Sequence, residues 1–167
     1  MKSISKQIRK LIGGLSLLAY FAALWPVSAP AQPAFDSANT PHVQRNALNS
    51  VRSHVNWLQN STRTASNFGE QGYGSVRRSF EELRLAYVAL TQALTPQQSA
   101  HGANDLAELN TGLDIIQEAF TYYEDDVAAG KSPRAALANL CRVLRQDSTL
   151  WLQELNKTSF RLQIGLA

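Results

Sequence analysis

Apolar residues recur at three- and four-residue steps through most of the chain after residue 40. This spacing gathers them on one side of an α-helix, and no stretch alternates apolar and polar residues long enough to indicate a strand. In one segment the stripe consists of Val76, Phe80, Leu83, Tyr87 and Leu90. We therefore expect an all-α protein built from amphipathic helices.

The starts of these helices are marked by a repeated pair of residues. A hydroxyl residue precedes a proline at Thr40-Pro41, Thr95-Pro96 and Ser132-Pro133. The hydroxyl can accept a bond from an unpaired helical N–H, and proline suits the first helical position because it has no N–H to leave unpaired. A fourth start is expected at Ser75, because the three glycines of segment 67–74 favour a loop.

Short turns between long helices favour antiparallel neighbours, so we predict an up-down-up-down four-helix bundle as one domain over residues 41–165. Gly130 and Gly165 are expected to end the third and fourth helices. Residues 101–104 either kink the third helix or split off a short leading turn. The expected helices cover residues 41–66, 75–94, 96–129 and 133–163.

The first 31 residues have the order of features found in a secretory signal peptide. Four basic residues precede an apolar run of 15 residues from Leu11 to Trp25, and Ala29-Pro30-Ala31 then offers a small-x-small cleavage site. A bilayer span takes about 20 residues, so the run is short for a membrane helix. We expect cleavage after Ala31 and export to the periplasm or an equivalent extracytoplasmic compartment, with an uncleaved anchor as the alternative. Residues 32–40 are expected to be a disordered lead-in.

Removal of the signal peptide changes the charge of the chain. The whole sequence has 16 Lys and Arg against 13 Asp and Glu, but four of the bases and none of the acids lie in residues 1–31. The mature chain therefore has 12 bases against 13 acids, a net charge of −1. No nucleic-acid partner is expected on this balance. Cys141 is the only cysteine, which excludes an intramolecular disulfide, and it lies on an apolar helix face.

The charges are sorted by helix. Arg45, Arg52 and Arg63 occupy a stretch, residues 41–68, that has no acid. At 100° per residue they fall within about 20° of one another, along one edge of the first helix. Because the expected neighbouring helices are also basic, we expect this Arg line to face outward toward an acidic partner protein or an anionic membrane surface. The alternative is that sorted charge only sets which helices pair.

The third helix has the opposite character. Residues 95–129 contain seven acids and no Lys or Arg. Three of the acids point away from the apolar stripe, with two apolar residues beside them, which makes a candidate docking patch or else a solvated helix back. The patch consists of Asp114, Ile115, Glu118, Tyr122 and Asp125. Trp57, off the stripe of the first helix, is a candidate interface anchor if no neighbouring segment covers it.

Residue patterns for catalysis or metal binding are missing. None of His42, His54 and His101 has a Glu three residues before it, so the di-iron pattern of helical bundles is absent. No Cys-x-x-Cys-His occurs, and Met1 is the only methionine, which leaves no Met ligand for haem in the mature chain. We expect no enzyme activity, no metal and no cofactor. A metal- or haem-binding bundle is the alternative least supported by these residues.

One short motif resembles that of a known family. Leu94-Thr95-Pro96-Gln97-Gln98 is similar to the Leu-Thr-x-x-Gln pattern of the periplasmic Spy and CpxP family, although that family carries a second copy and is rich in methionine. This resemblance implies a helical chaperone or stress sensor. The expected architecture is also similar to that of PsbQ-like extrinsic subunits of photosystem II, which implies an accessory subunit of a membrane complex.

The residues together predict a non-enzymatic exported binding or accessory protein. It would dock a protein partner, or an anionic membrane surface, through segregated charge and a few apolar residues outside the core stripes.

Overall fold

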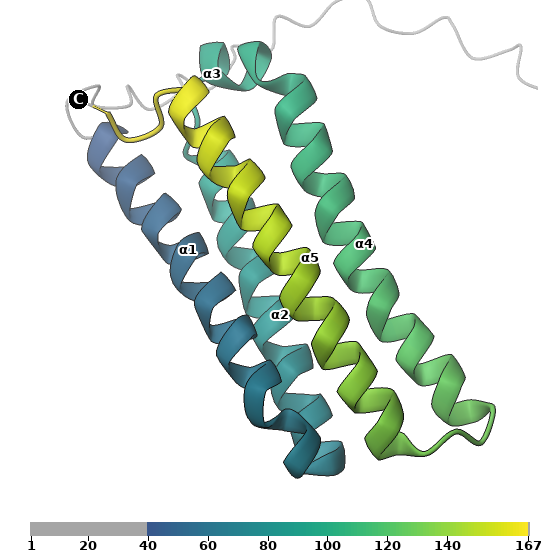
Figure 1. The fold of residues 1–167 in the computed structure, drawn as a ribbon. Coiled ribbons are helices and arrows are strands. Elements are labelled where there is room, and N and C mark those ends of the chain that lie inside the picture. Colours follow the sequence, from purple (N-terminus) through teal and green to yellow (C-terminus); the bar gives the residue numbers. More distant parts are fainter. Residues whose placement is uncertain (1–39, 167) are drawn as a thin grey trace, which may run out of the picture. The chain divides into compact units, whose positions relative to one another are not determined.

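The computed structural model describes residues 40–166, and this part of the chain is all-helical with no strand. The prediction of an all-α protein is thus confirmed. The predicted signal peptide and residues 32–39 of the predicted lead-in lie outside the described residues. Figure 1 shows the elements, which are α1 (Thr40–Thr64), the short 3₁₀ turn η1 (Ala65–Asn67), α2 (Gly69–Gln92), α3 (Pro96–His101), α4 (Ala103–Ala128) and α5 (Pro133–Arg161).

The long helices contact one another in antiparallel pairs. α1 packs against α2 and against α5, and α5 also packs against α4 (Figure 1). α2 and α4 meet through aromatic side chains, with the Phe80 and Phe120 rings 5.3 Å apart and the Tyr73 and Tyr123 rings 4.4 Å apart. All four long helices contribute to one buried apolar cluster, which includes Val55, Phe80, Phe120 and Leu144.

The start of the second helix differs from the prediction. α2 begins at Gly69, six residues before Ser75, so the expected glycine loop is largely helical. Gly72 explains this outcome because a Cβ there would lie 2.0 Å from the carbonyl oxygen of Ala65. The close approach of the two backbones requires a residue without a side chain. Gly72 lets α2 pack directly against the backbone of the preceding turn, and this contact outweighs the low helix propensity of glycine.

The predicted third helix is divided in two. α3 ends at His101 and α4 begins at Ala103, which is the short leading turn considered as one of the two alternatives. Thr95 makes the expected cap, since its side chain accepts from Gln98 N and the Gln98 side chain accepts from Thr95 N. This reciprocal pair is a capping box. The equivalent residue Ser132 makes no side-chain cap bond.

α4 and α5 end in the same hydrogen-bond motif, with a different residue in the left-handed conformation in each. Gly130 has φ +83°, and the pattern of Gly130 N to Val127 O and Lys131 N to Asp126 O is a Schellman motif that ends α4. α5 ends at Arg161 in the same motif, but Gln163 is the left-handed residue, with φ +53°. The prediction that Gly165 ends this helix is therefore wrong.

Within residues 40–166, no helix combines the length and the apolar character needed to cross a membrane.

Candidate docking surface

The five residues predicted as a patch on the third helix lie together on the outer side of α4, and all are exposed. Ile115 is 51% exposed and Tyr122 is 61% exposed, so two large side chains lie at the surface within the patch of acids. The Tyr122 hydroxyl donates to Glu118 Oε1 at 2.8 Å, and this hydrogen bond raises the pKa of Tyr122. We call Asp114, Ile115, Glu118, Tyr122 and Asp125 the acidic face.

The acids of this face have no cationic partner. None of the ion pairs within residues 40–166 includes Asp114, Glu118 or Asp125. Among the other acids of α4, Glu108 is also unpaired within residues 40–166, whereas Asp126 contacts Lys131 Nζ at 2.6 Å and Asp105 contacts Arg161 Nη2 at 2.8 Å. The negative charge left uncompensated on α4 is therefore concentrated on its outer side.

Two separate hollows lie along the seam between α4 and α5, beside the acidic face. The one near the α4–α5 turn has a volume of about 260 Å³, and Tyr122 and Val143 both line it. A second, more open hollow of about 540 Å³ lies toward the start of α4, where Glu108, Lys157 and Phe160 are among the lining residues. We call the seam between α4 and α5, with one hollow toward each of its ends, the α4/α5 groove.

The α5 side of the groove carries an exposed apolar residue that the sequence analysis did not select. Leu150 is 56% exposed. Its neighbour Trp151 donates from Nε1 to Leu109 O at 2.8 Å and packs against Gly112, where an added Cβ would lie 2.6 Å from the indole ring. This register in an antiparallel pair places Leu150 at about the level of Ile115. The sequence could have indicated Leu150, because this residue lies well off the apolar stripe of the last helix and follows Val143 by seven positions.

The Arg line lies on the α5 side of α1, away from the acidic face. Arg45 donates from Nε and Nη2 to Gly165 O at 3.2 and 2.9 Å, and Arg52 donates in the same two-pronged way to Asn156 Oδ1 at 3.1 and 2.9 Å. Arg63 is exposed. None of the three belongs to an ion pair within the described residues. Two of these guanidinium groups are therefore engaged by neutral acceptors of their own chain, and the outward contact expected for the Arg line stays a prediction.

Trp57 lies on the other edge of α1 and is 54% exposed. Its ring meets that of His54 edge to face, with centroids 4.6 Å apart. His54 Nδ1 in turn lies 3.9 Å from Glu82 Oε2 of α2. The structure thus keeps Trp57 apart from both the Arg line and the acidic face, so the nine predicted site residues form three separate groups.

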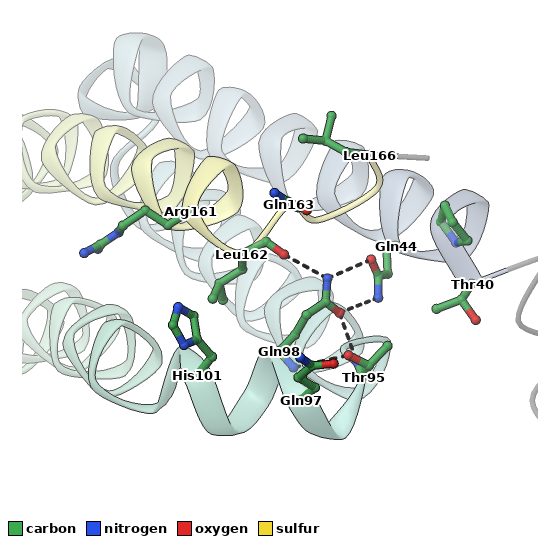
Figure 2. Close-up of a pocket in the computed structure, with 11 residues that line it drawn as sticks. Thr40, Gln44, Thr95, Gln97, Gln98, His101, Arg161, Leu162, Gln163 and Leu166 are labelled. Carbon is green, nitrogen blue, oxygen red and sulfur yellow. Dashed lines mark hydrogen bonds between the residues drawn. The ribbon is translucent and has the colours of Figure 1, made fainter.

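A larger hollow of about 580 Å³ opens where α1 begins and α5 ends, and Figure 2 shows the residues around it. Its inner wall is a hydrogen-bonded cluster around two amides. Gln98 Oε1 accepts from Gln44 Nε2 at 2.7 Å, and Gln98 Nε2 donates to Leu162 O at 2.9 Å. Gln44 also donates to Ala93 O and accepts from Gly165 N. Because these polar groups are satisfied within the chain, the cluster is a structural joint.

No three His, Cys, Asp or Glu side chains of residues 40–166 come close enough to hold a metal ion. Cys141 is buried, and this burial raises the pKa of its thiol.

No family model, no curated protein and no solved structure matches this chain.

Proposed function

We propose that this protein is an exported, non-enzymatic accessory protein that docks a protein partner through the acidic face and the adjoining α4/α5 groove. The observation that carries the proposal is the coincidence, on one side of the molecule, of unpaired acids with exposed large apolar side chains. Acids alone are typical of a solvated helix. Acids beside Ile115, Tyr122 and Leu150 are more typical of an interaction surface, where apolar contacts supply affinity and charge supplies partner choice.

The scaffold that we propose for this surface is an up-down-up-down four-helix bundle with α3 as an added turn. The antiparallel contacts of α1 with α2 and α5, and of α4 with α5, support this arrangement. In it the acidic face and the Arg line belong to helices on opposite corners. Each face is therefore available to a different partner.

Export is supported by the order of features in the first 31 residues, with basic residues, an apolar run and a cleavage pattern in that order. We propose the periplasm or an equivalent compartment as the place of action. A partner there could belong to a membrane complex. The Arg line, which has no acidic partner among residues 40–166, is proposed as a contact for an acidic protein or an anionic membrane surface.

The proposal is tested by capturing partners from the exported fraction with the purified protein as bait. We expect one dominant partner, and less of it retained as salt rises from low ionic strength, because the Debye length shrinks to about 8 Å at physiological salt. The variant D114N/E118Q/D125N should lose most of this partner. A matched control, E70Q/E81Q/E82Q on α2, changes the net charge equally and should retain it.

The proposal is wrong if the α4 variant and the wild-type protein capture the same partner equally well. A chaperone of the Spy and CpxP type is the alternative function. It would suppress the aggregation of several unrelated unfolded proteins and would show no single dominant partner.

A further inference from the structure

The α4/α5 groove has features that specify the kind of partner segment it accepts. We propose that it binds a basic amphipathic α-helix of the partner protein, laid along the groove with its apolar residues toward Ile115, Tyr122 and Leu150 and its cations toward the acidic face. This inference rests on the proposed function and gives the chemistry of the partner segment.

The apolar contacts are spaced for a helix. Ile115 and Tyr122 are seven residues apart on α4, and Val143 and Leu150 are seven residues apart on α5. Seven residues of helix advance about 10.5 Å, which is two turns. The two pairs thus present apolar positions at equal intervals along both walls. A helix with apolar residues every seven positions can occupy both levels at once, as in the packing of helices with a heptad repeat.

An extended peptide fits this groove less well. Peptides that bind as strands gain much of their affinity from main-chain hydrogen bonds to an open sheet edge. The regular elements of the described residues are all helices, with no strand, and the backbone groups in the middle of α4 and α5 are paired within those helices. A peptide along the α4/α5 groove therefore gains little from its own backbone groups unless it pairs them internally, as a helix does.

The charge of the groove favours a cation-bearing partner. Over the stretch from Ile115 to Tyr122, the α4 wall carries Glu118 and is flanked by Asp114 and Asp125, none of them in an ion pair within residues 40–166. The residues that α5 contributes to the nearby hollow are Ala136, Asn139, Leu140 and Val143, all uncharged.

Two cations border this region. Lys131 pairs with Asp126, whereas Arg142 donates to the neutral Asn139 Oδ1 at 2.9 Å and keeps its charge. At the other end of the groove, Lys157 pairs with Glu154. Within residues 40–166, the three unpaired acids of the acidic face outweigh the one unpaired charge of Arg142, so the net uncompensated charge along the middle of the groove is negative.

A second copy of this chain is a weaker fit than a foreign basic helix. Among the described residues, the only long helix without acids is α1, where Arg45 and Arg52 already donate to acceptors of their own chain. The exposed Trp57 is on the opposite edge of α1 from these arginines. One docked α1 helix could not direct its apolar residue and its cations toward the same groove.

The experiment uses the purified protein and three synthetic peptides of about 21 residues, which is three heptads. The first has Leu at the apolar heptad positions and Lys elsewhere on the contact side. The second replaces every Lys by Glu, and the third has the composition of the first with its periodicity scrambled. Binding is measured by the fluorescence anisotropy of a dye on the peptide, and helix formation by circular dichroism.

We expect saturable binding of the first peptide together with a gain of peptide helicity, no binding of the second, and at least roughly tenfold weaker binding of the third. The variant I115S/L150S should weaken the first peptide by roughly tenfold or more, since such anchors carry most of the binding energy. The control L85S/V88S removes two exposed apolar residues from α2 and should bind as the wild type does.

Three outcomes would overturn the inference. Equal binding of the basic helix and its scrambled form would mean that only charge is recognised. Equal binding by I115S/L150S and by wild type would place the contact elsewhere. Sedimentation could instead reveal dimers that form as the protein concentration rises. If these dimers were lost in both D114N/E118Q/D125N and R45Q/R52Q/R63Q, the segment bound in the groove would belong to a second copy of this chain. The first peptide could also fail to bind while capture of a salt-sensitive partner still depends on the acidic face. In that case the partner segment is not a basic amphipathic helix, but the proposed function stands.

Discussion

Gln44 and Gln98 illustrate what a single residue can do that sequence patterns do not reveal. They are 54 positions apart, yet their amides meet at 2.7 Å and join α1 to α3 and to the end of α5 (Figure 2). The Leu-Thr-x-x-Gln segment predicted only a helix cap at this place. Its Gln98 completes that cap and also reaches across to Leu162 O, which no local pattern could have indicated.

The substitution Gln98→Ala tests how much this hydrogen-bonded cluster contributes to the stability of the protein. It removes a partner from Gln44 Nε2, Thr95 N and Leu162 O at once. Unsatisfied buried groups cost about 1–3 kcal/mol, so we expect the free energy of unfolding to fall by that amount. Urea denaturation measures it. The adjacent Gln97 is exposed, and Gln97→Ala should change stability by less than about 0.5 kcal/mol. Equal effects of the two substitutions would show that the cluster contributes little.

Residue-scale exposure was predictable on α4 because it depends on helical phase alone. Ile115 and Tyr122 lie off the core stripe and are exposed in the structure. Leu150 gave the same signal on its own helix, but its importance depends on its being level with Ile115. That level is set by Trp151 packing against Gly112, a contact between residues 39 positions apart.

At the scale of the elements, the sequence indicated the helices better than their boundaries. The apolar periodicity identified all four long segments, and the residues around Gly102 were correctly seen as a point of interruption. The glycine-rich segment 67–74 was wrongly expected to be a loop. Glycine counts against a helix by propensity, but Gly72 is retained within α2 because it lies against Ala65.

Two glycines of α2 provide a paired test of this explanation. A Cβ at Gly72 would overlap the Ala65 carbonyl, whereas a Cβ at Gly74 would meet nothing within 4 Å. We expect Gly72→Ala to destabilise the protein by about 1–3 kcal/mol through overpacking. Gly74→Ala should stabilise it by about 0.5–1 kcal/mol, because alanine loses less backbone entropy in a helix. Thermal denaturation of both variants measures the effects. If both had the same sign, the close approach at Gly72 would not be the reason for the glycine.

At the scale of the whole molecule, the described helices share one apolar cluster, so they should unfold together. We expect strongly helical circular dichroism and one cooperative transition for residues 32–167. Trp57 reports on the outer side of α1 and Trp151 on the core beside α4, so fluorescence and circular dichroism should give coincident melting curves. Two separate transitions, or a substantial strand signal, would contradict a single helical domain.

The joint at the end of α5 also bears on when the protein finishes folding. Gly165 N donates to Gln44 Oε1 and Gly165 O accepts from Arg45, so the segment after α5 binds to the first helix of the described structure. During synthesis, this segment emerges after all the helices that it joins. Gln44, which is 3% exposed in the folded protein, therefore lacks one of its hydrogen-bond partners until Gly165 has been synthesised. Synthesis of residues 162–165 thus closes the joint, and a chain that stops after Arg161 would leave it open.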